Sequence, residues 1–335
     1  MLIEEIKNLT ANTSISGVFA ASNCLLKAFE KKDDHFLSCN LADKTGSAPA
    51  IMWSNAKKTK QWLRNKTVVE ISGKVSIYRN QPQIVIEKIA KAETFDINVL
   101  LPTLGPLKIM SYHKALYNEF VSVDKYKFIW EKIFADSRFK WCPGGVGNVH
   151  HNYLGGLIEH CYEMVIQAER ICSLYPELDR QLLKIGALIH DIGKLESYSW
   201  DTIIEMSDEG RLFGHTAIGF RYMSDLLAKS RIGCTEIGTN NVNKLLHIIL
   251  SHHGEKSMIK PMFAEAAVIS CIDSNSASVN YITNFIKENK QEDSNWTSWS
   301  NLTQTFYYLD GQKTTEIPVE EKKFIKEDDD INEPA

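Results

Sequence analysis

The feature that most constrains how this chain can fold is a series of histidine and aspartate residues in its second half. The series is centred on His190 and Asp191, which end the apolar run containing Leu188 and Ile189. Burying an imidazole and a carboxylate without partners costs several kcal/mol. The rest of the series comprises His160, His215, His252, His253 and Asp273. We expect the fold to bring these groups together, and a divalent metal ion is the simplest group that would compensate for their burial.

Bulk composition indicates an ordinary globular protein. A length of 335 residues favours two domains, and 44% hydrophobic with 24% charged residues is typical of soluble proteins. No apolar run reaches the roughly 18 residues that span a bilayer. The segment Met1–Lys7 carries acids where a signal peptide would have a basic segment followed by an apolar one. We therefore expect a cytoplasmic protein that does not act on membranes.

The cysteines and the charge distribution further limit the kinds of protein that this chain can be. The seven cysteines form no Cys-x-x-Cys pair, which argues against a disulfide framework or a zinc ribbon. Cys161, Cys172 and Cys271 lie in apolar helical patterns and are expected in the core. Residues 1–95 hold 14 basic and 9 acidic residues, whereas residues 316–335 hold 3 basic and 8 acidic ones. A basic front module and an acidic tail are therefore expected to have separate roles.

Residues 1–95 have the pattern of a small β-barrel. The strands are predicted at residues 14–20, 35–41, 48–53, 67–78 and 83–89. A polar helix is predicted over residues 56–65, between the third and fourth strands. This order matches the OB-fold barrel, so residues 1–95 are expected to form an OB-fold nucleic-acid-binding domain.

The remainder of the chain is predicted to be helical. Residues 96–140 are expected to be a linker and a helical lead-in, residues 141–310 an all-α bundle, and residues 311–335 an acidic, disordered tail. The clearest helices are predicted from Leu154 to about Cys172, with Pro176 beyond the end, and at about 179–190, 241–252 and 263–286. The fold class is thus a multidomain α and β protein, with a barrel followed by a bundle.

The histidine and aspartate residues fall at helix ends and within helices, from which ligands can converge in the interior of a bundle. A carboxylate such as Asp191 can bridge two ions, and two ions about 3.5–4 Å apart can act on a phosphodiester. Imidazole and carboxylate ligands without thiolates suit Mn, Fe, Co, Ni or Zn, of which we favour Mn. By contrast, His35, His113 and His247 adjoin no partner motif and are expected to be structural or surface residues.

This series resembles that of the HD-domain metal-dependent phosphohydrolases over about residues 145–285. The resemblance implies that His160, His190, Asp191 and Asp273 form the minimal ligand set. The added His215, His252 and His253 resemble the branch of that superfamily that binds two metals. Lys194 follows Asp191 by three residues and is expected to stabilise charge on a phosphate, although a solvated lysine at a helix end is the alternative. His151 is a further candidate for substrate contact or proton donation, with a capping or turn role as the alternative.

The front module offers candidate contacts to a single strand. An OB barrel can stack bases on aromatic side chains while basic residues follow the phosphates. The candidates are Phe36, Trp53, Lys57, Lys58, Tyr78 and Arg79. The alternatives are that Phe36 and Trp53 only fill the barrel, and that the lysines form a solvated helix face.

The order of the two modules resembles that of the YhaM-type 3′–5′ exoribonucleases over about residues 10–310. The stretches that carry this resemblance are Leu41–Gly46, His150–His160 and Ser251–Glu255. It implies Mn-dependent removal of nucleoside monophosphates from the 3′ ends of single-stranded RNA, with single-stranded DNA as a further candidate, by hydroxide bridged between two metals. After Asp273 the family commonly has a second acid, whereas this chain has Ser274-Asn275-Ser276, which bears on substrate preference.

Three other functions compete with this one. The same pocket could hydrolyse cyclic dinucleotides or small nucleotides, with the barrel in a regulatory role. The chain could also be a single-strand-binding protein whose pocket is no longer catalytic, or an oxygenase with two irons. The intact ligand series argues against a protein that only binds single strands, and the nucleic-acid module argues against an oxygenase. The sequence does not indicate the oligomeric state.

Overall fold

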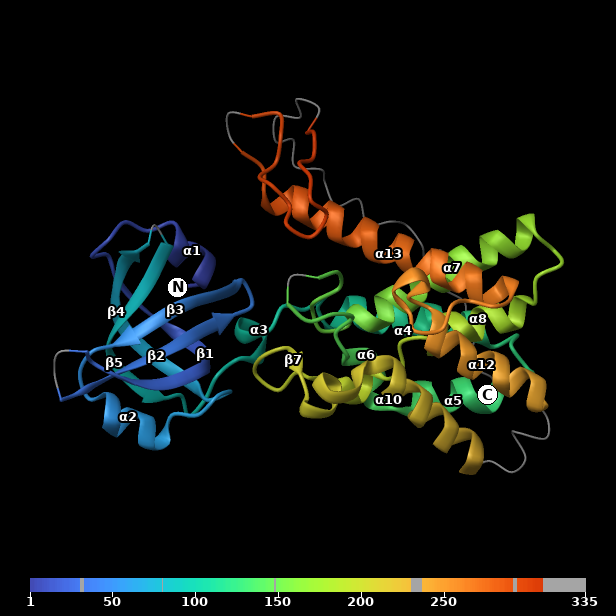
Figure 1. The fold of residues 1–335 in the computed structure, drawn as a ribbon, viewed down its shortest axis with the longest axis horizontal. Coiled ribbons are helices and arrows are strands. Elements are labelled where there is room, and N and C mark those ends of the chain that lie inside the picture. Colours follow the sequence, from blue (N-terminus) through green and yellow to red (C-terminus); the bar gives the residue numbers. More distant parts are fainter. Residues whose placement is uncertain (31–32, 80, 148, 230–236, 292–293, 310–335) are drawn as a thin grey trace, which may run out of the picture. The chain divides into compact units, whose positions relative to one another are not determined.

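The structure is a computed structural model that describes residues 1–30, 33–79, 81–147, 149–229, 237–291 and 294–309 (Figure 1). The chain divides into two compact units, Met1–Tyr281 and Ile282–Ala335. The tail predicted over residues 311–335 lies outside the described residues. Within the described ranges, no helix has both the length and the apolar character needed to cross a bilayer.

The N-terminal part is a closed five-stranded barrel, as predicted. Its strands, in the order β1-β2-β3-β5-β4, close by antiparallel pairing of β1 with β4, and β3 pairs with β5 in parallel. A short helix precedes β1 and another connects β3 to β4. The bounds are α1 (Ile3–Lys7), β1 (Ser14–Ala28), β2 (His35–Asp43), β3 (Gly46–Met52), α2 (Ala56–Trp62), β4 (Val68–Tyr78) and β5 (Gln81–Lys91). This arrangement is the OB fold.

Strand β1 is longer than predicted. The alternation of residues suggested an end at Ala20, but the strand continues to Ala28. Its pairing with β2 shifts register between Ser22 and Leu25, and Asn23 there has a φ of 50°. A bulge of this kind inserts an extra residue and reverses the in-and-out alternation beyond it, so the pattern used for prediction stops at the bulge although the strand does not.

The chain after the barrel is mainly helical, and the four helices predicted most clearly lie within a few residues of their predicted positions. The bounds are α3 (Ile97–Leu100), α4 (Pro106–Phe120), α5 (Lys127–Ala135), α6 (Ser137–Trp141), α7 (Gly156–Leu174), α8 (Arg180–Ile189), α9 (Lys194–Ser197), α10 (Asp208–Lys229), α12 (Thr239–Ser251) and α13 (Ala264–Glu288). A two-stranded ribbon, β6 (Tyr198–Ser199) and β7 (Glu205–Met206), follows α9, and a 3₁₀ turn, η1 (Gly254–Lys256), follows α12. Residues 96–140, predicted as a linker and a helical lead-in, thus contain α3, α4, α5 and most of α6.

Helices α7 and α8 supply much of the apolar core around the histidine and aspartate series. Asp179 caps α8 by accepting a hydrogen bond from the amide of Leu182, at 3.0 Å, and Leu182 to Ile189 are all buried. Burying this helix carries His190 into the interior. The cysteines among the described residues are free, as expected. The prediction for Cys271 was wrong: it is exposed, because it lies on the outer side of α13 while Ile272 and Asp273 face inward.

Candidate metal centre

All seven side chains predicted as metal ligands come together in the helical part. His160 lies in the second turn of α7, Asp273 lies within α13, and the other five lie at helix ends or breaks. His190 and Asp191 follow α8, and His252 and His253 follow α12. Gly214 interrupts α10 with φ 72° and ψ 156°, so that His215 opens a new helical segment. A positive φ of this kind favours glycine, which explains the Gly-His pair.

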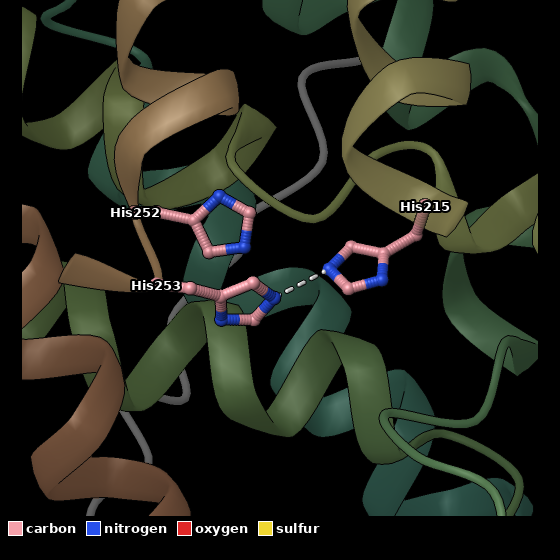
Figure 2. A group of neighbouring side chains, drawn as sticks. All are labelled: His215, His252 and His253. Atoms are coloured by element: carbon pink, nitrogen blue, oxygen red, sulfur yellow. Dashed lines mark hydrogen bonds between the residues drawn. The ribbon is translucent and has the colours of Figure 1, made fainter. Parts of the chain in front are cut away.

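The seven residues form two groups. The candidate ligand atoms of His160, His190, Asp191 and Asp273 all lie within 4.8 Å of one another, and all four residues are buried. Those of His215, His252 and His253 form a second group within the same distance. In Figure 2 the three imidazoles of the second group point toward one another, and Nε2 of His253 lies 2.9 Å from Nε2 of His215.

Asp191 lies between the two groups, with one carboxylate oxygen toward each. Its Oδ1 atom is 3.2 Å from Nε2 of His215 and 3.5 Å from Nε2 of His252. Its Oδ2 atom is 3.2 Å from Nε2 of His190 and 3.8 Å from Nε2 of His160. A carboxylate in this orientation can donate one oxygen to a cation in each group.

Asp273 also spans the two groups, although less closely. Its Oδ1 atom lies 3.1 Å from Nε2 of His160, and its Oδ2 atom lies 3.7 Å from Nδ1 of His253. Each group therefore combines imidazole nitrogens with a carboxylate oxygen within reach. Hard oxygen and borderline nitrogen donors together suit divalent transition metals.

The hydrogen bonds of the histidine rings leave hydrogen-bond acceptors pointing into the centre. Nδ1 of His190 lies 3.0 Å from the carbonyl oxygen of Ala187, and Nδ1 of His252 lies 2.8 Å from that of Ile249. A carbonyl can only accept, so both Nδ1 atoms carry a proton, and each ring in its neutral form presents the lone pair of Nε2. Among the described residues, Nε2 of His252 and Oδ1 of Asp191 are buried without a hydrogen-bond partner. Buried acceptors of this kind are costly unless a cation binds them, so the residues fit a divalent metal.

The electrostatics keep three of the histidines and Asp191 in the protonation states that bind metals. Burial lowers the pKa of His160 to about 4, that of His215 to about 3 and that of His253 to about 4. Burial alone would raise the pKa of Asp191, but the charges of Lys194 and His190 lower it well below its usual value. Neutral imidazoles and an ionised carboxylate are the forms that bind metals. His190 differs from the other three: burial alone would lower its pKa, but the charge of Asp191 raises it, so a metal would compete with a proton at this ring.

Lys194 is buried beside Asp191. Its Nζ atom lies 2.5 Å from Oδ2 of Asp191 and 2.5 Å from the carbonyl oxygen of Gly144. These contacts connect the lysine to Asp191, and its contact with a phosphate stays a prediction. The neighbouring Gly193 is required by packing, because a Cβ there would overlap the carbonyl oxygen of His215.

His151, predicted as a substrate contact, is fully buried in a network of polar side chains. Its Nδ1 atom lies 3.1 Å from the hydroxyl of Tyr153 and 3.4 Å from Oε2 of Glu159. Its Nε2 atom lies 3.4 Å from Oγ of Ser276 and 3.6 Å from Oε2 of Glu163. Both ring nitrogens therefore face protein groups rather than the two ligand groups.

The sequence analysis missed the other members of this network. Glu159 accepts hydrogen bonds from the hydroxyls of Tyr112, at 2.9 Å, and Tyr153, at 2.6 Å. Glu159 and Glu163 lie one residue before and three residues after His160, so their spacing along α7 was a usable signal. Tyr112 and Ser276 come from α4 and α13, and nothing in the local sequence connects them to His151.

On the barrel, the structure brings together two of the predicted aromatic residues and adds a third. The rings of Phe36 and Trp53 lie 5.3 Å apart, and that of Phe29 lies 5.1 Å from Phe36 and 5.8 Å from Trp53. Trp53 is 48% exposed, so the cluster is open to solvent on one side. Sequence reasoning missed Phe29 because it ended β1 at Ala20. The predicted Lys57 and Lys58 are exposed on α2, which begins three residues after Trp53.

The other predicted pair does not join this cluster. Arg79 stacks over the ring of Tyr78 at 5.3 Å, and Tyr78 pairs with Gln81 at the start of β5. Because β5 runs parallel to β3 with Ile84 opposite Ala50, Tyr78 lies toward the start of β3, whereas Trp53 follows its end. The six predicted nucleic-acid contacts therefore divide between two ends of the barrel.

The histidines set aside as structural behave as expected. Nε2 of His247 accepts a hydrogen bond from the amide of Met262 at 3.1 Å, and the ring of His113 packs edge-on against Phe134 at 5.3 Å. His35 lies on β2, in the barrel. None of the three belongs to the two ligand groups found among the described residues.

Comparison with known proteins agrees with both domains. The family model described as "HD domain" matches residues 157–278, and that described as "OB-fold nucleic acid binding domain" matches residues 24–92. The chain is 30% identical to the 3′-5′ exoribonuclease YhaM of Bacillus subtilis over 257 residues, covering 73% of this chain and 79% of the relative. The chain belongs to the YhaM family. The YhaM of Shouchella clausii is 31% identical over 73% of this chain and 78% of its own length, and that of a Geobacillus species is 28% identical over 82% and 85%.

Membership of the YhaM family accounts for the arrangement of the chain. The OB-fold barrel precedes the HD domain, and the HD match over residues 157–278 contains all seven residues predicted as metal ligands. The ligand groups, the buried acceptors and the aromatic cluster are features of this chain itself.

Proposed function

We propose that this chain is a metal-dependent 3′–5′ exoribonuclease that removes nucleoside monophosphates from single-stranded RNA. The observation that carries the proposal is the position of Asp191, whose two oxygens face separate groups of candidate ligands. That arrangement suits two cations acting on one phosphodiester. The names of the YhaM relatives support the polarity and the substrate.

The metal is proposed to be a pair of divalent cations, with Mn²⁺ favoured. His160, His190 and Asp273 would hold one ion, and His215, His252 and His253 the other, with Asp191 shared between them. When bound, two such ions supply a hydroxide near neutral pH and stabilise the charge on the leaving oxygen. Ligation by nitrogen and oxygen without thiolate also permits Fe, Co, Ni or Zn.

The exposure of the ligands indicates the side from which the substrate enters. The side chains of His160 and His190 are fully buried, whereas those of His215 and His253 are 18% and 39% exposed. The second group is thus the open side of the centre. We propose that the terminal phosphodiester approaches there, while Lys194 holds Asp191 in place and adds positive charge behind it.

The barrel is proposed to hold the strand upstream of the cleaved end. Phe29, Phe36 and Trp53 form an aromatic surface on which bases can stack, and each stacked base contributes about 1–3 kcal/mol. Lys57 and Lys58 follow on α2 and would contact phosphates. Stacking does not depend on the ribose, so the aromatic surface would also accept single-stranded DNA.

The direct test is degradation of a 5′-labelled RNA with a single-stranded 3′ tail in the presence of Mn²⁺. We expect a ladder of products that shorten one nucleotide at a time, and release of nucleoside monophosphates. A circular RNA of the same sequence has no 3′ end and should survive. Hydrolysis of the circle, or hydrolysis of cyclic dinucleotides with no attack on the linear strand, would refute the proposal.

Replacing Asp191 with alanine separates an enzyme from a protein that only binds single strands. Asp191→Ala removes the shared ligand, so we expect hydrolysis to disappear while binding of labelled single-stranded RNA by the barrel persists. Binding is measured by fluorescence anisotropy and hydrolysis on a gel. Undiminished hydrolysis in the variant would show that the centre is not the catalytic site. Oxygen consumption by the iron-loaded protein would point instead to an oxygenase.

A further inference from the structure

The buried histidines of the centre differ in how their outer nitrogen is held. Nδ1 of His190 and Nδ1 of His252 each face a backbone carbonyl three residues earlier in the chain. A carbonyl has no proton to give, so this contact by itself places the proton on Nδ1 and leaves Nε2 free to bind a cation. The backbone of α8 and α12 thus determines the tautomer of both rings.

His160 has no such carbonyl partner. Its Nδ1 atom lies 2.9 Å from Oγ of Ser276, which reaches it from α13. A serine hydroxyl can donate as well as accept, so this contact alone would leave the tautomer of His160 undetermined. Something must direct the hydroxyl if His160 is to present a lone pair from Nε2.

Glu163 supplies that direction. Oγ of Ser276 donates a hydrogen bond of 2.6 Å to Oε2 of Glu163. An ionised carboxylate only accepts, so the hydroxyl proton is committed to Glu163 and the serine oxygen must accept from Nδ1 of His160. Nε2 of His160 then carries the lone pair that faces Oδ1 of Asp273 at 3.1 Å.

The two supporting residues come from the same helices as the ligands they serve. Glu163 follows His160 by one turn on α7, and Ser276 follows Asp273 by one turn on α13. Ser276 is buried, with 2% of its surface exposed. The contacts therefore cross between the helices: the serine of α13 orients the histidine of α7.

We propose that Ser276 and Glu163 are positioning residues that set the tautomer and orientation of His160 for metal binding. The proposal rests on the metal-dependent function proposed above. Partners of this kind, beyond the ligands themselves, typically contribute 10- to 100-fold to metal affinity. The buried ring of His151 packs beside the pair, with Nε2 3.4 Å from Oγ of Ser276, so its role here is to support them.

The test is calorimetric titration of the metal-free protein with Mn²⁺, without RNA. Ser276→Ala removes the acceptor for Nδ1 of His160, and we expect its affinity for Mn²⁺ to fall by about 10- to 100-fold. Ser276→Thr keeps the hydroxyl and should recover most of that affinity. Glu163→Gln keeps a hydrogen-bonding group but loses the negative charge that orients the hydroxyl, so we expect a smaller loss.

Ser278→Ala is the matched control, because Ser278 is exposed on the same helix and lies outside the network. We expect it to bind Mn²⁺ like the wild type. Suppose that Ser276→Ala folds, with or without a loss of heat stability, and that its affinity for Mn²⁺ is within twofold of the wild-type affinity. The role of Ser276 is then structural, and the proposal fails. A wild-type protein that binds no Mn²⁺ also overturns it. If the wild type binds Mn²⁺ but degrades no RNA, the proposed function fails. The inference about Ser276 and Glu163 is then decided by the Mn²⁺ affinities of the variants.

Discussion

Lys194 shows how a single residue can take a role that its sequence position does not reveal. Its position after His190 and Asp191 indicated a phosphate contact or a solvated side chain. In the structure the ammonium group is buried against Oδ2 of Asp191 at 2.5 Å. The lysine therefore neutralises the carboxylate before any substrate arrives, and its removal would affect the folded protein itself.

We predict that Lys194→Met destabilises the metal-free protein by about 3–5 kcal/mol, because it leaves the buried charge of Asp191 without its partner. Mn²⁺ should restore part of the stability, since a cation also neutralises Asp191. The measurement is urea denaturation with a chelator and with Mn²⁺. Lys127→Met, which removes an exposed pair with Glu131, should change stability by less than about 1 kcal/mol. Equal midpoints for Lys194→Met and the wild type in chelator would contradict the role assigned to this lysine.

Glu159 provides a prediction on pH. Burial alone would raise its pKa, but hydrogen bonds from His151 and Tyr153 lower it to about 2, from a usual 4.5. A carboxyl group with a lowered pKa in the folded state stabilises the fold above its unfolded pKa, and this contribution is lost as the pH falls toward the folded value. We therefore expect the stability difference between the wild type and Glu159→Gln to be full above about pH 5 and to shrink between about pH 4.5 and 2. Urea denaturation at a series of pH values measures it, and a constant difference would rule out this ionisation.

At the scale of elements, the approach of α9 to α10 decides whether the two ligand groups meet. Gly193 precedes α9, and a Cβ there would overlap the carbonyl oxygen of His215 and lie 2.5 Å from the amide nitrogen of Gly219. Both are backbone atoms, so no side-chain rotation relieves the overlap. The glycine thus lets the segment carrying His215 lie against the segment carrying Asp191.

We predict that Gly193→Ala separates α9 from α10, with a loss of at least about 2 kcal/mol in stability and a strong loss of Mn²⁺ affinity. Gly186→Ala in α8 is the control, because the nearest atoms to its Cβ would be side-chain carbons of Ile248 and Ile269, at 3.1–3.3 Å, which can shift. We expect that change to be nearly neutral, since alanine favours the helix by up to about 1 kcal/mol. Thermal denaturation and calorimetry measure both. Normal Mn²⁺ binding by Gly193→Ala would show that the close approach is not required.

The elements themselves were largely predictable. The helix from Leu154 to about Cys172 was recognised from its apolar spacing, because a buried amphipathic helix has a local signature. The first strand was predicted too short, since the bulge after Ser22 reverses the alternation without ending the pairing. As a result Phe29, which follows β1, was missed as a member of the aromatic cluster.

At the scale of the whole molecule, the proposed function gives the barrel and the helical domain separable contributions to activity. In that proposal the aromatic cluster holds only a strand long enough to occupy it, while the ligand groups act on one phosphodiester. A change on the barrel should therefore alter the dependence on substrate length rather than the chemistry.

We predict that Trp53→Ala raises KM for a long single-stranded RNA by about 5- to 100-fold, corresponding to the loss of about one stacked base. The rate on a dinucleotide should be unchanged. Tyr78→Ala, at the end of β4 and at the opposite end of the barrel from Trp53, serves as the comparison and should have the smaller effect. Steady-state kinetics on substrates of two lengths test this. A fall in the dinucleotide rate, or a larger effect from Tyr78→Ala, would argue against the cluster as the surface that holds the strand.

The sequence by itself determined the two fold classes and the identity of the seven candidate ligands, because strand alternation, helical periodicity and the His-Asp spacing are local properties. Only the tertiary structure decided which oxygen of Asp191 faces which group, that Lys194 pairs with that aspartate, and that Ser276 holds His160. The last of these contacts joins residues 116 positions apart and depends on hydrogen bonds of about 3 Å. Such distances depend on how whole helices pack against one another, which a local sequence pattern does not predict.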